Sequence, residues 1–243
     1  MKGLIQPNLL RTGCEMDETK QSFENRKSEI DNYFKMLAIF NNDDTRLQYK
    51  KEGDLITEKI QPQFRIILIA NAFLILYNLI ESTVRNSIIE IYTKIQDDKL
   101  SYQELSANLK KIWIKQTTDN LKEGNYKPET LRNYVFDLAK DILNNEIIIL
   151  SKENMDFAGN LDAQKIRDLA DNIGFNISPD GRNLVEIKIK RNRLAHGEQT
   201  FYDVGKDFSV PQVFAFKDET FSYLSDVIEK IDIFIRDKKY ATN

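Results

Sequence analysis

The sequence predicts an all-α protein: a helical bundle with an N-terminal helical extension and one long irregular loop before the last helix. The 243 residues include only nine glycines and five prolines, which fall between long helical patterns. In those patterns apolar residues recur every three or four positions, the spacing of one helix face. No run of alternating apolar and polar residues indicates a sheet. Hydrophobic residues make up 41% of the chain, which is enough to form a core.

The N-terminal extension is predicted at residues 1–60, ahead of a bundle at residues 61–243, although the two parts could form one continuous domain. The extension contains two helices. The first covers residues 17–40, with apolar side chains at helical spacing. The second covers residues 45–59, because the preceding Asn-Asn-Asp-Asp sequence breaks the first helix and its last residue, Asp44, is a suitable N-cap.

The bundle begins with its most apolar element, a helix predicted at residues 63–95, which we expect at the centre of the fold. Ser101 opens the next helix, because Glu104 completes a capping box three residues later. This helical pattern fades near Gly124. A further helix is predicted at residues 128–150, since its first residue is a proline, which suits a first helical turn.

Three more helices complete the predicted bundle. Residues 160–162, Asn-Leu-Asp, are expected to cap a short helix that ends at Gly174. The next helix covers residues 182–196. Residues 198–216 contain a glycine and a proline and show no helical period, so they are predicted to form an extended loop or a short hairpin. The last helix is predicted at residues 218–238.

Composition restricts the classes of function. The net charge is −3, so any nucleic-acid binding would depend on a local basic patch rather than on the charge of the whole protein. The single cysteine, Cys14, excludes an internal disulfide. With His196 as the only histidine, one chain cannot form a zinc site of the common Cys/His type. We therefore expect no metal, no cofactor and a reducing, cytoplasmic setting.

No membrane partner is expected either. Residues 1–13 lack the apolar stretch of an export signal. The most apolar stretch, residues 66–80, is interrupted by Asn71 and Asn78 and is too short to span a bilayer. It is therefore predicted to be a helix buried in a protein core.

The single histidine closes the sequence Lys-Arg-Asn-Arg-Leu-Ala-His at residues 190–196. On a helix, Lys188, Asn192 and His196 share a face, and the long side chain of Arg191 can reach the same point. Arginine matches a phosphate with two hydrogen bonds, asparagine donates or accepts one, and histidine transfers protons near neutral pH. Together they suit phosphodiester cleavage in which a 2′-hydroxyl is the internal nucleophile, a reaction that needs no metal.

A second interpretation is also consistent with this spacing, and the spacing alone favours it. A basic run at the end of a helix complements the negative end of the helix dipole, and His196 followed by Gly197 is a common helix terminus. Lys188, Lys190 and Arg193 would then form a solvated face. The cleavage hypothesis has a further requirement, because acid–base catalysis needs two proton-transfer groups. One histidine per chain therefore turns it into a hypothesis of a symmetric dimer.

Residues 191–196, Arg-Asn-Arg-Leu-Ala-His, resemble the motif of the HEPN superfamily: an arginine, a polar residue, a few variable residues and a histidine, late in an all-α bundle. The longer segment at residues 184–197 supports this likeness. Residues 200–205 and 159–163 are similar to the bacterial MAE-type HEPN nuclease group. The resemblance covers about residues 63–239 and implies a HEPN-type helical bundle.

The resemblance implies a metal-independent endoribonuclease that acts on RNA, such as tRNA or other single-stranded or loop RNA, as a homodimer with a composite active site. It also implies a toxin or defence effector with an antitoxin or a defence-system partner. Arg191, Asn192 and His196 would be catalytic, and the products would be a 2′,3′-cyclic phosphate and a 5′-hydroxyl. Some HEPN toxins carry a tyrosine two residues after the histidine, where a nucleotidyltransferase modifies them. Glu198 stands there in this chain, which puts that control in doubt.

Other residues are candidates for substrate binding. Lys188, Lys190 and Arg193 could contact phosphates beside the motif. Glu81 either lines the cleft, orienting Arg191 or the substrate, or forms a plain helix pair with the arginine four residues later. Tyr202 could stack on an unpaired base, or it could pin its loop to the core.

Two other functions stay open. The chain could be a catalytically inactive HEPN-like module that binds a nucleotide, RNA or a partner protein. It could also be an adaptor whose basic helix contacts an acidic protein. Cleavage of RNA would select the nuclease over both alternatives.

Overall fold

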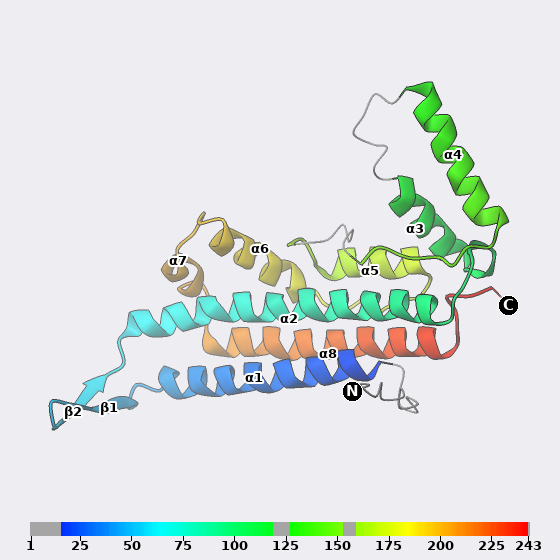
Figure 1. Cartoon of the computed structure of the whole chain (residues 1–243). Coiled ribbons are helices and arrows are strands. Elements are labelled where there is room, and N and C mark those ends of the chain that lie inside the picture. The colour runs from blue at the N-terminus through cyan, green and yellow to red at the C-terminus, as the bar shows by residue number, and fades with distance from the viewer. Residues whose placement is uncertain (1–15, 119–126, 153–158, 243) are drawn as a thin grey trace, which may run out of the picture.

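The computed structural model describes residues 16–118, 127–152 and 159–242. Three long helices lie side by side and form the body of the fold: α1 (Asp17–Asn41), α2 (Pro62–Asp97) and α8 (Val210–Arg236) (Figure 1). The all-α prediction is confirmed, because helices make up most of these residues and the one sheet found among them has two strands.

Helix α2 is the central element, as predicted. It contacts α1, α8, α6 (Asn183–Ala195) and the short helix α7 (Phe201–Gly205). By length and composition alone α2 could cross a membrane, since the mean hydropathy of its most apolar window is 1.7. Half of that window, 50%, is nevertheless buried inside the bundle. Core helices of helical bundles share this composition.

Helix α1 packs as part of the body. Its residues Phe34 and Leu37 are buried in the same core as side chains of α2 and α8. The ring of Phe34 meets the ring of Phe214 on α8 edge-on, with 5.1 Å between centroids, a favoured aromatic geometry. One continuous core therefore runs through the N-terminal helix and the rest of the bundle.

The prediction of a second helix at residues 45–59 is wrong. These residues form an antiparallel hairpin of β1 (Arg46–Lys51) and β2 (Asp54–Lys59). The two turn residues, Glu52 and Gly53, have φ angles of 53° and 96°. A two-residue turn with positive φ at both positions matches the twist of paired strands, and glycine adopts that conformation without strain.

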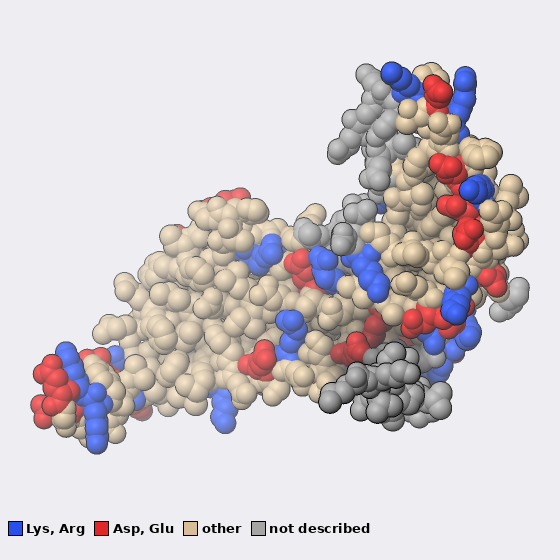
Figure 2. Space-filling view, viewed as in Figure 1, with Lys and Arg blue, Asp and Glu red and all other residues tan. Residues whose placement is uncertain are grey.

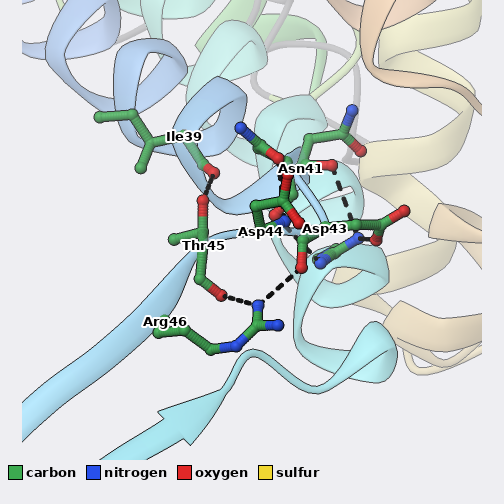
Figure 3. A network of polar contacts seen from close by, with 8 residues as sticks. Ile39, Asn41, Asp43, Asp44, Thr45 and Arg46 are labelled. Atoms are coloured by element: carbon green, nitrogen blue, oxygen red, sulfur yellow. Dashed lines mark hydrogen bonds and ion pairs between the residues drawn. The ribbon is translucent and has the colours of Figure 1, made fainter.

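Polar contacts fasten the start of the hairpin to α1 and α2 (Figure 3). The hydroxyl of Thr45 donates to the carbonyl of Ile39 at 2.6 Å, and Arg46 Nη1 donates to the carbonyl of Asp43 at 2.7 Å. The guanidinium of Arg65 on α2 donates to the Asp43 carboxylate at 2.6 Å, and this hydrogen bond lowers the pKa of Asp43. The contacts support a two-stranded hairpin that would be marginal alone.

The capping box predicted at Ser101 and Glu104 is present, but it closes only a single 3₁₀ turn (Tyr102–Glu104). Helix α3 (Ala107–Thr118) starts after this turn and not at Ser101. The predicted fading of this helix near Gly124 lies outside the described residues, as does Cys14.

The helix predicted at residues 128–150 is too long. The observed helix, α4 (Pro128–Leu143), stops before Asn145, whose φ of 53° is left-handed. The β-branched residues that follow are extended, and Ile147 forms an isolated antiparallel bridge with Ser101. Pairing with a distant segment, which the local pattern did not reveal, decides their conformation.

The prediction of a long irregular loop at residues 198–216 is also wrong. This fully described stretch contains α7, and α8 begins before the predicted residue 218. Thr200 caps α7 with its side chain, and Ser209 and Gln212 form a capping box at the start of α8. Helix-start signals of this kind are local, and they outweigh the missing apolar period in so short a segment.

The short helix predicted after residues 160–162 is confirmed as α5 (Ala163–Ile173). Asp162 is its N-cap, and its carboxylate accepts a hydrogen bond of 2.9 Å from the backbone N–H of Lys165. Gly174 ends the helix with a φ of 112°, a conformation that favours glycine. Helix α6 has almost its predicted bounds, so residues 159–162 and α6 frame one region of the structure.

Candidate functional site

The single histidine lies at the C-terminal end of α6. The N–H of Gly197, whose φ is 70°, donates to the carbonyl of Leu194, and the N–H of Glu198 donates to the carbonyl of Arg193 at 2.9 Å. These two hydrogen bonds form a Schellman motif, which fixes the backbone of His196. Its imidazole is exposed and has no hydrogen-bond partner among the described residues. The predicted helix terminus is therefore present, and it presents the histidine to solvent.

Arg191 leaves α6 on the side that faces α2. Its Nη2 lies 3.8 Å from Oε2 of Glu81, and its Cζ lies 4.3 Å from the ring centroid of Tyr77. Its Nη1 donates to Oδ1 of Asn192 at 2.9 Å. The Arg191 side chain retains 22% of its exposure. The guanidinium is therefore held on three sides and still reaches solvent.

Tyr77 connects this arginine to the segment before α5. Its hydroxyl accepts a hydrogen bond of 3.0 Å from the backbone N–H of Leu161. Burial raises the pKa of the fully buried phenol, so Tyr77 is neutral near pH 7. At Gly159, where φ is 74°, an added Cβ would lie 3.2 Å from Nη1 of Arg191. Residues 159–161 therefore border the guanidinium closely.

Lys188 points to the same segment and pairs with Asp162. Burial raises the pKa of this carboxyl, but hydrogen bonds from the Lys188 ammonium and from the backbone N–H of Lys165 outweigh it and lower the pKa overall. Both side chains are largely buried, with 19% of Lys188 and 14% of Asp162 exposed. Lys188 thus holds a protein carboxylate, which a phosphate would have to displace.

Two other predicted phosphate contacts have different surroundings. Lys190 is only 8% exposed, and its ammonium lies 5.2 Å from the ring centroid of Phe208 and 3.6 Å from Glu186. The structure therefore does not bring Lys190 to Arg191. Arg193 is exposed near the end of α6, where its Nη1 donates to the Gln199 side chain at 3.4 Å.

Tyr202 lies on α7 and is 46% exposed. The ammonium of Lys206 stands 5.7 Å from its ring centroid. Helix α7 packs closely on α2, because a Cβ added at Gly205 would lie 2.0 Å from the carbonyl oxygen of Ile66. No contact joins Tyr202 to Arg191 in the part of the chain that the structure describes, so its stacking role stays a prediction.

Glu81 lies close to both of the arginines considered from the sequence, Arg85 on its own helix and Arg191 on α6. It lies 3.9 Å from Arg85 on its own helix and 3.8 Å from Arg191 on α6. Sequence reasoning missed Tyr77, which precedes Glu81 by four residues and shares its helix face, so the spacing could have revealed it. Leu161 acts through its backbone N–H, which no residue pattern announces.

The arrangement combines a held guanidinium with an exposed imidazole on one helix. The guanidinium can bind a phosphate and stabilise added negative charge, and the imidazole can exchange protons with a bound molecule. In residues 16–118, 127–152 and 159–242, no group of three His, Cys, Asp or Glu side chains is placed to hold a metal ion.

Comparison with known proteins gives one result for nearly the whole chain. A family model with the description HEPN_MAE_28990:/-like HEPN matches residues 16–240. Comparisons with curated proteins and with solved structures gave no match. The matched range contains every described helix and strand, and thus both α6 and the residues of α2 that contact Arg191.

Proposed function

Because the chain belongs to the MAE_28990-like HEPN family, which supports a nuclease or RNA-related role, we propose that it is a metal-independent endoribonuclease. One observation supports this proposal most directly. Helix α6 carries Arg191, whose guanidinium is held by Glu81 and Tyr77, and ends beside the exposed His196. Arg191 can hold a phosphodiester and His196 can move a proton, which are the two tasks that RNA cleavage requires.

In the proposed reaction the 2′-hydroxyl of the substrate loses its proton to a histidine and attacks the adjacent phosphorus. Arg191 binds the phosphate and stabilises the charge that develops on its oxygens, while Asn192 orients the guanidinium through its hydrogen bond. The bond from phosphorus to the 5′-oxygen then breaks, and that oxygen takes a proton from a second histidine. The products are a 2′,3′-cyclic phosphate and a 5′-hydroxyl.

The two proton transfers lead to the second part of the proposal, a homodimer. Each chain has one histidine, so a site with a base and an acid requires His196 from both copies. The exposed position of the imidazole at the end of α6 allows a second chain to approach it. Single-stranded or loop RNA, such as tRNA, is the proposed substrate, since a protein can reach an unpaired nucleotide without opening a duplex.

The biological role proposed for this activity is that of a toxin or a defence effector in the cytoplasm. Its activity would be held in check by an antitoxin or a defence-system partner. The support comes from the family alone. Glu198 occupies the position where some HEPN toxins carry a modified tyrosine, so the proposed control does not use modification at that position.

The first test is cleavage of total RNA and tRNA by the pure protein in EDTA. Wild type should cut in the chelator, and His196→Ala should lose at least about 100-fold in rate, the usual contribution of a proton-transfer group. Mapping the ends should show a 2′,3′-cyclic phosphate upstream of each cut. Arg236→Ala, at an exposed arginine at the end of α8 and outside the candidate site, is the control and should keep most of the activity.

Two results would contradict this assignment. One is cleavage by His196→Ala at the wild-type rate, which would exclude the histidine from the chemistry. The other is tight RNA binding by wild type without cleavage of any RNA, which would identify the chain as an inactive HEPN-like binding module.

A further inference from the structure

We propose that Tyr77 is a positioning residue for Arg191, an inference that deepens the proposed ribonuclease function and rests on it. Tyr77 touches no reacting atom in this proposal. Its ring fixes the plane of the guanidinium, so that the arginine presents its donors to a phosphate in one orientation.

The geometry of the contact distinguishes this role from simple core packing. The Arg191 Cζ stands 4.3 Å from the ring centroid, the distance of a guanidinium that lies against the face of an aromatic ring. The ion pair with Glu81 is 3.8 Å long, which exceeds hydrogen-bond distance. An ion pair of that length attracts the charge but leaves the plane of the guanidinium undetermined. The hydrogen bond to Asn192 fixes one end of the guanidinium, and the ring face of Tyr77 fixes its plane.

Tyr77 is itself immobilised by the segment before α5. Its side chain is completely buried, and its hydroxyl accepts the backbone N–H of Leu161, which is also buried. The next residue, Asp162, pairs with Lys188 on α6. Helix α2, residues 159–162 and α6 are thus linked in a closed ring of contacts. Because these contacts hold the aromatic ring of Tyr77 in place, the ring can determine the orientation of the arginine that packs on it.

Gly159 completes the enclosure from another side. The position for its missing Cβ lies 3.2 Å from Nη1 of Arg191, closer than ordinary van der Waals contact. Only a residue without a side chain leaves the guanidinium undisturbed there. Asn192 takes one hydrogen bond from Nη1, so most of the five N–H donors of Arg191 stay available for a phosphate.

The first experiment measures the arginine without relying on ribonuclease activity. Phenylglyoxal modifies accessible guanidinium groups, and mass spectrometry gives the rate at each arginine. Replacing the ring in Tyr77→Met should raise the rate at Arg191 by roughly 2- to 30-fold, the factor that corresponds to a cation–π contact. Tyr77→Phe keeps the ring and loses only its hydrogen bond with Leu161, so the rate at Arg191 should rise less than in Tyr77→Met. Arg193 on the same helix is the internal reference.

Tyr92→Met is the matched control, because Tyr92 is another buried tyrosine of α2, four helical turns beyond the site. It should leave the Arg191 rate unchanged. If Tyr77→Met does not fold, Gly159→Ala reaches the guanidinium from the other side and should change the ratio of Arg191 to Arg193 rates. Gly53→Ala is its control, since Gly53 also has a positive φ but an added Cβ there meets nothing within 4 Å. Equal Arg191 rates in each variant and its control would overturn the proposal.

The second experiment measures cleavage of a labelled single-stranded RNA. Tyr77→Met should lower kcat by about 10- to 100-fold with a smaller change in KM, since misplacing a catalytic group acts mainly on the transition state. Tyr77→Phe should restore most of the kcat. If wild type cuts RNA and Tyr77→Met cuts equally well, the positioning role is wrong and the ribonuclease stands. If wild type never cuts but Arg191 becomes more reactive in Tyr77→Met, the contact is right and the proposed function is wrong.

Discussion

Lys188, Lys190 and Arg191 lie within four positions of one helix and end in three different environments. Lys188 pairs with the carboxylate before α5, Lys190 is buried against Phe208, and Arg191 lies on Tyr77. Spacing on the helix predicts which side chains share a face, but the neighbour on each face depends on how the helices pack. The motif could therefore be predicted from the sequence, whereas the burial of Lys190 could not.

A prediction at this scale concerns Asp162, which combines a helix cap with an ion pair. Asp162→Ala loses both and should destabilise the fold by about 1–3 kcal/mol. Asp162→Asn keeps a capping oxygen and loses only the charge, so it should cost less. Thermal unfolding followed by circular dichroism gives both values, and equal losses for the two variants would show that the cap contributes little.

The contribution of the Asp162 carboxylate to the free energy of unfolding should decrease as the pH is lowered. The pKa of Asp162 is lowered in the folded protein, so the ionised carboxylate stabilises the fold above the unfolded pKa of about 3.9. That stabilisation is lost as the pH falls through the folded value. The difference in unfolding free energy between wild type and Asp162→Asn should therefore be full at about pH 7 and smaller at about pH 3. A difference that grows in acid would contradict the lowered pKa.

At the scale of elements, the sequence predicted α2, α5 and α6 well because their signals are local. A long apolar pattern, an Asp cap and a terminal glycine each act within a few residues. The hairpin at residues 46–59 was not predicted because Asp44 was interpreted as the N-cap of a second helix, whereas strand pairing and the left-handed Glu52-Gly53 turn determine the structure. The extended stretch after α4 depends on pairing with Ser101, more than forty residues earlier.

Helix α7 offers a test of close packing between elements. A Cβ at Gly205 would stand 2.0 Å from the backbone carbonyl of Ile66 on α2, and a backbone atom cannot move aside like a flexible side chain. Gly205→Ala should therefore destabilise the fold by about 3 kcal/mol. The control Gly53→Ala has a strained φ but open space around it, and it should cost about 1 kcal/mol. Equal unfolding temperatures for the two variants would contradict the close approach of α7 to α2.

At the scale of the whole molecule, charge is unevenly distributed. On the face shown in Figure 2, charged side chains gather over the hairpin and over the end of the molecule that carries α3 and α4. The body next to the hairpin is mostly uncharged on this face (Figure 2). With a net charge of −3, the protein lacks a general attraction for RNA, so recognition would depend on the small region around Arg191.

The proposed homodimer gives a prediction for the whole molecule. Light scattering should report about twice the 28.4 kDa of one chain. If each site needs both histidines, adding an equal amount of His196→Ala under conditions of subunit exchange should reduce wild-type activity to about half, because mixed dimers are inactive. Activity that does not change on mixing, or a monomer at micromolar concentration, would contradict the composite site.

The contacts around Arg191 also determine when the site can form during synthesis. They join residues 77–81 to residues 159–162, with 84 positions between Tyr77 and Leu161, and to α6, which in turn packs on α8. Contacts between such distant segments form late and only as the domain folds as a unit. A chain still emerging from the ribosome would carry Arg191 without the contacts to Tyr77 and Glu81 that hold it. For the proposed ribonuclease, the phosphate-binding arginine would thus gain its fixed orientation only after α6 has packed against residues 77–81 and 159–162.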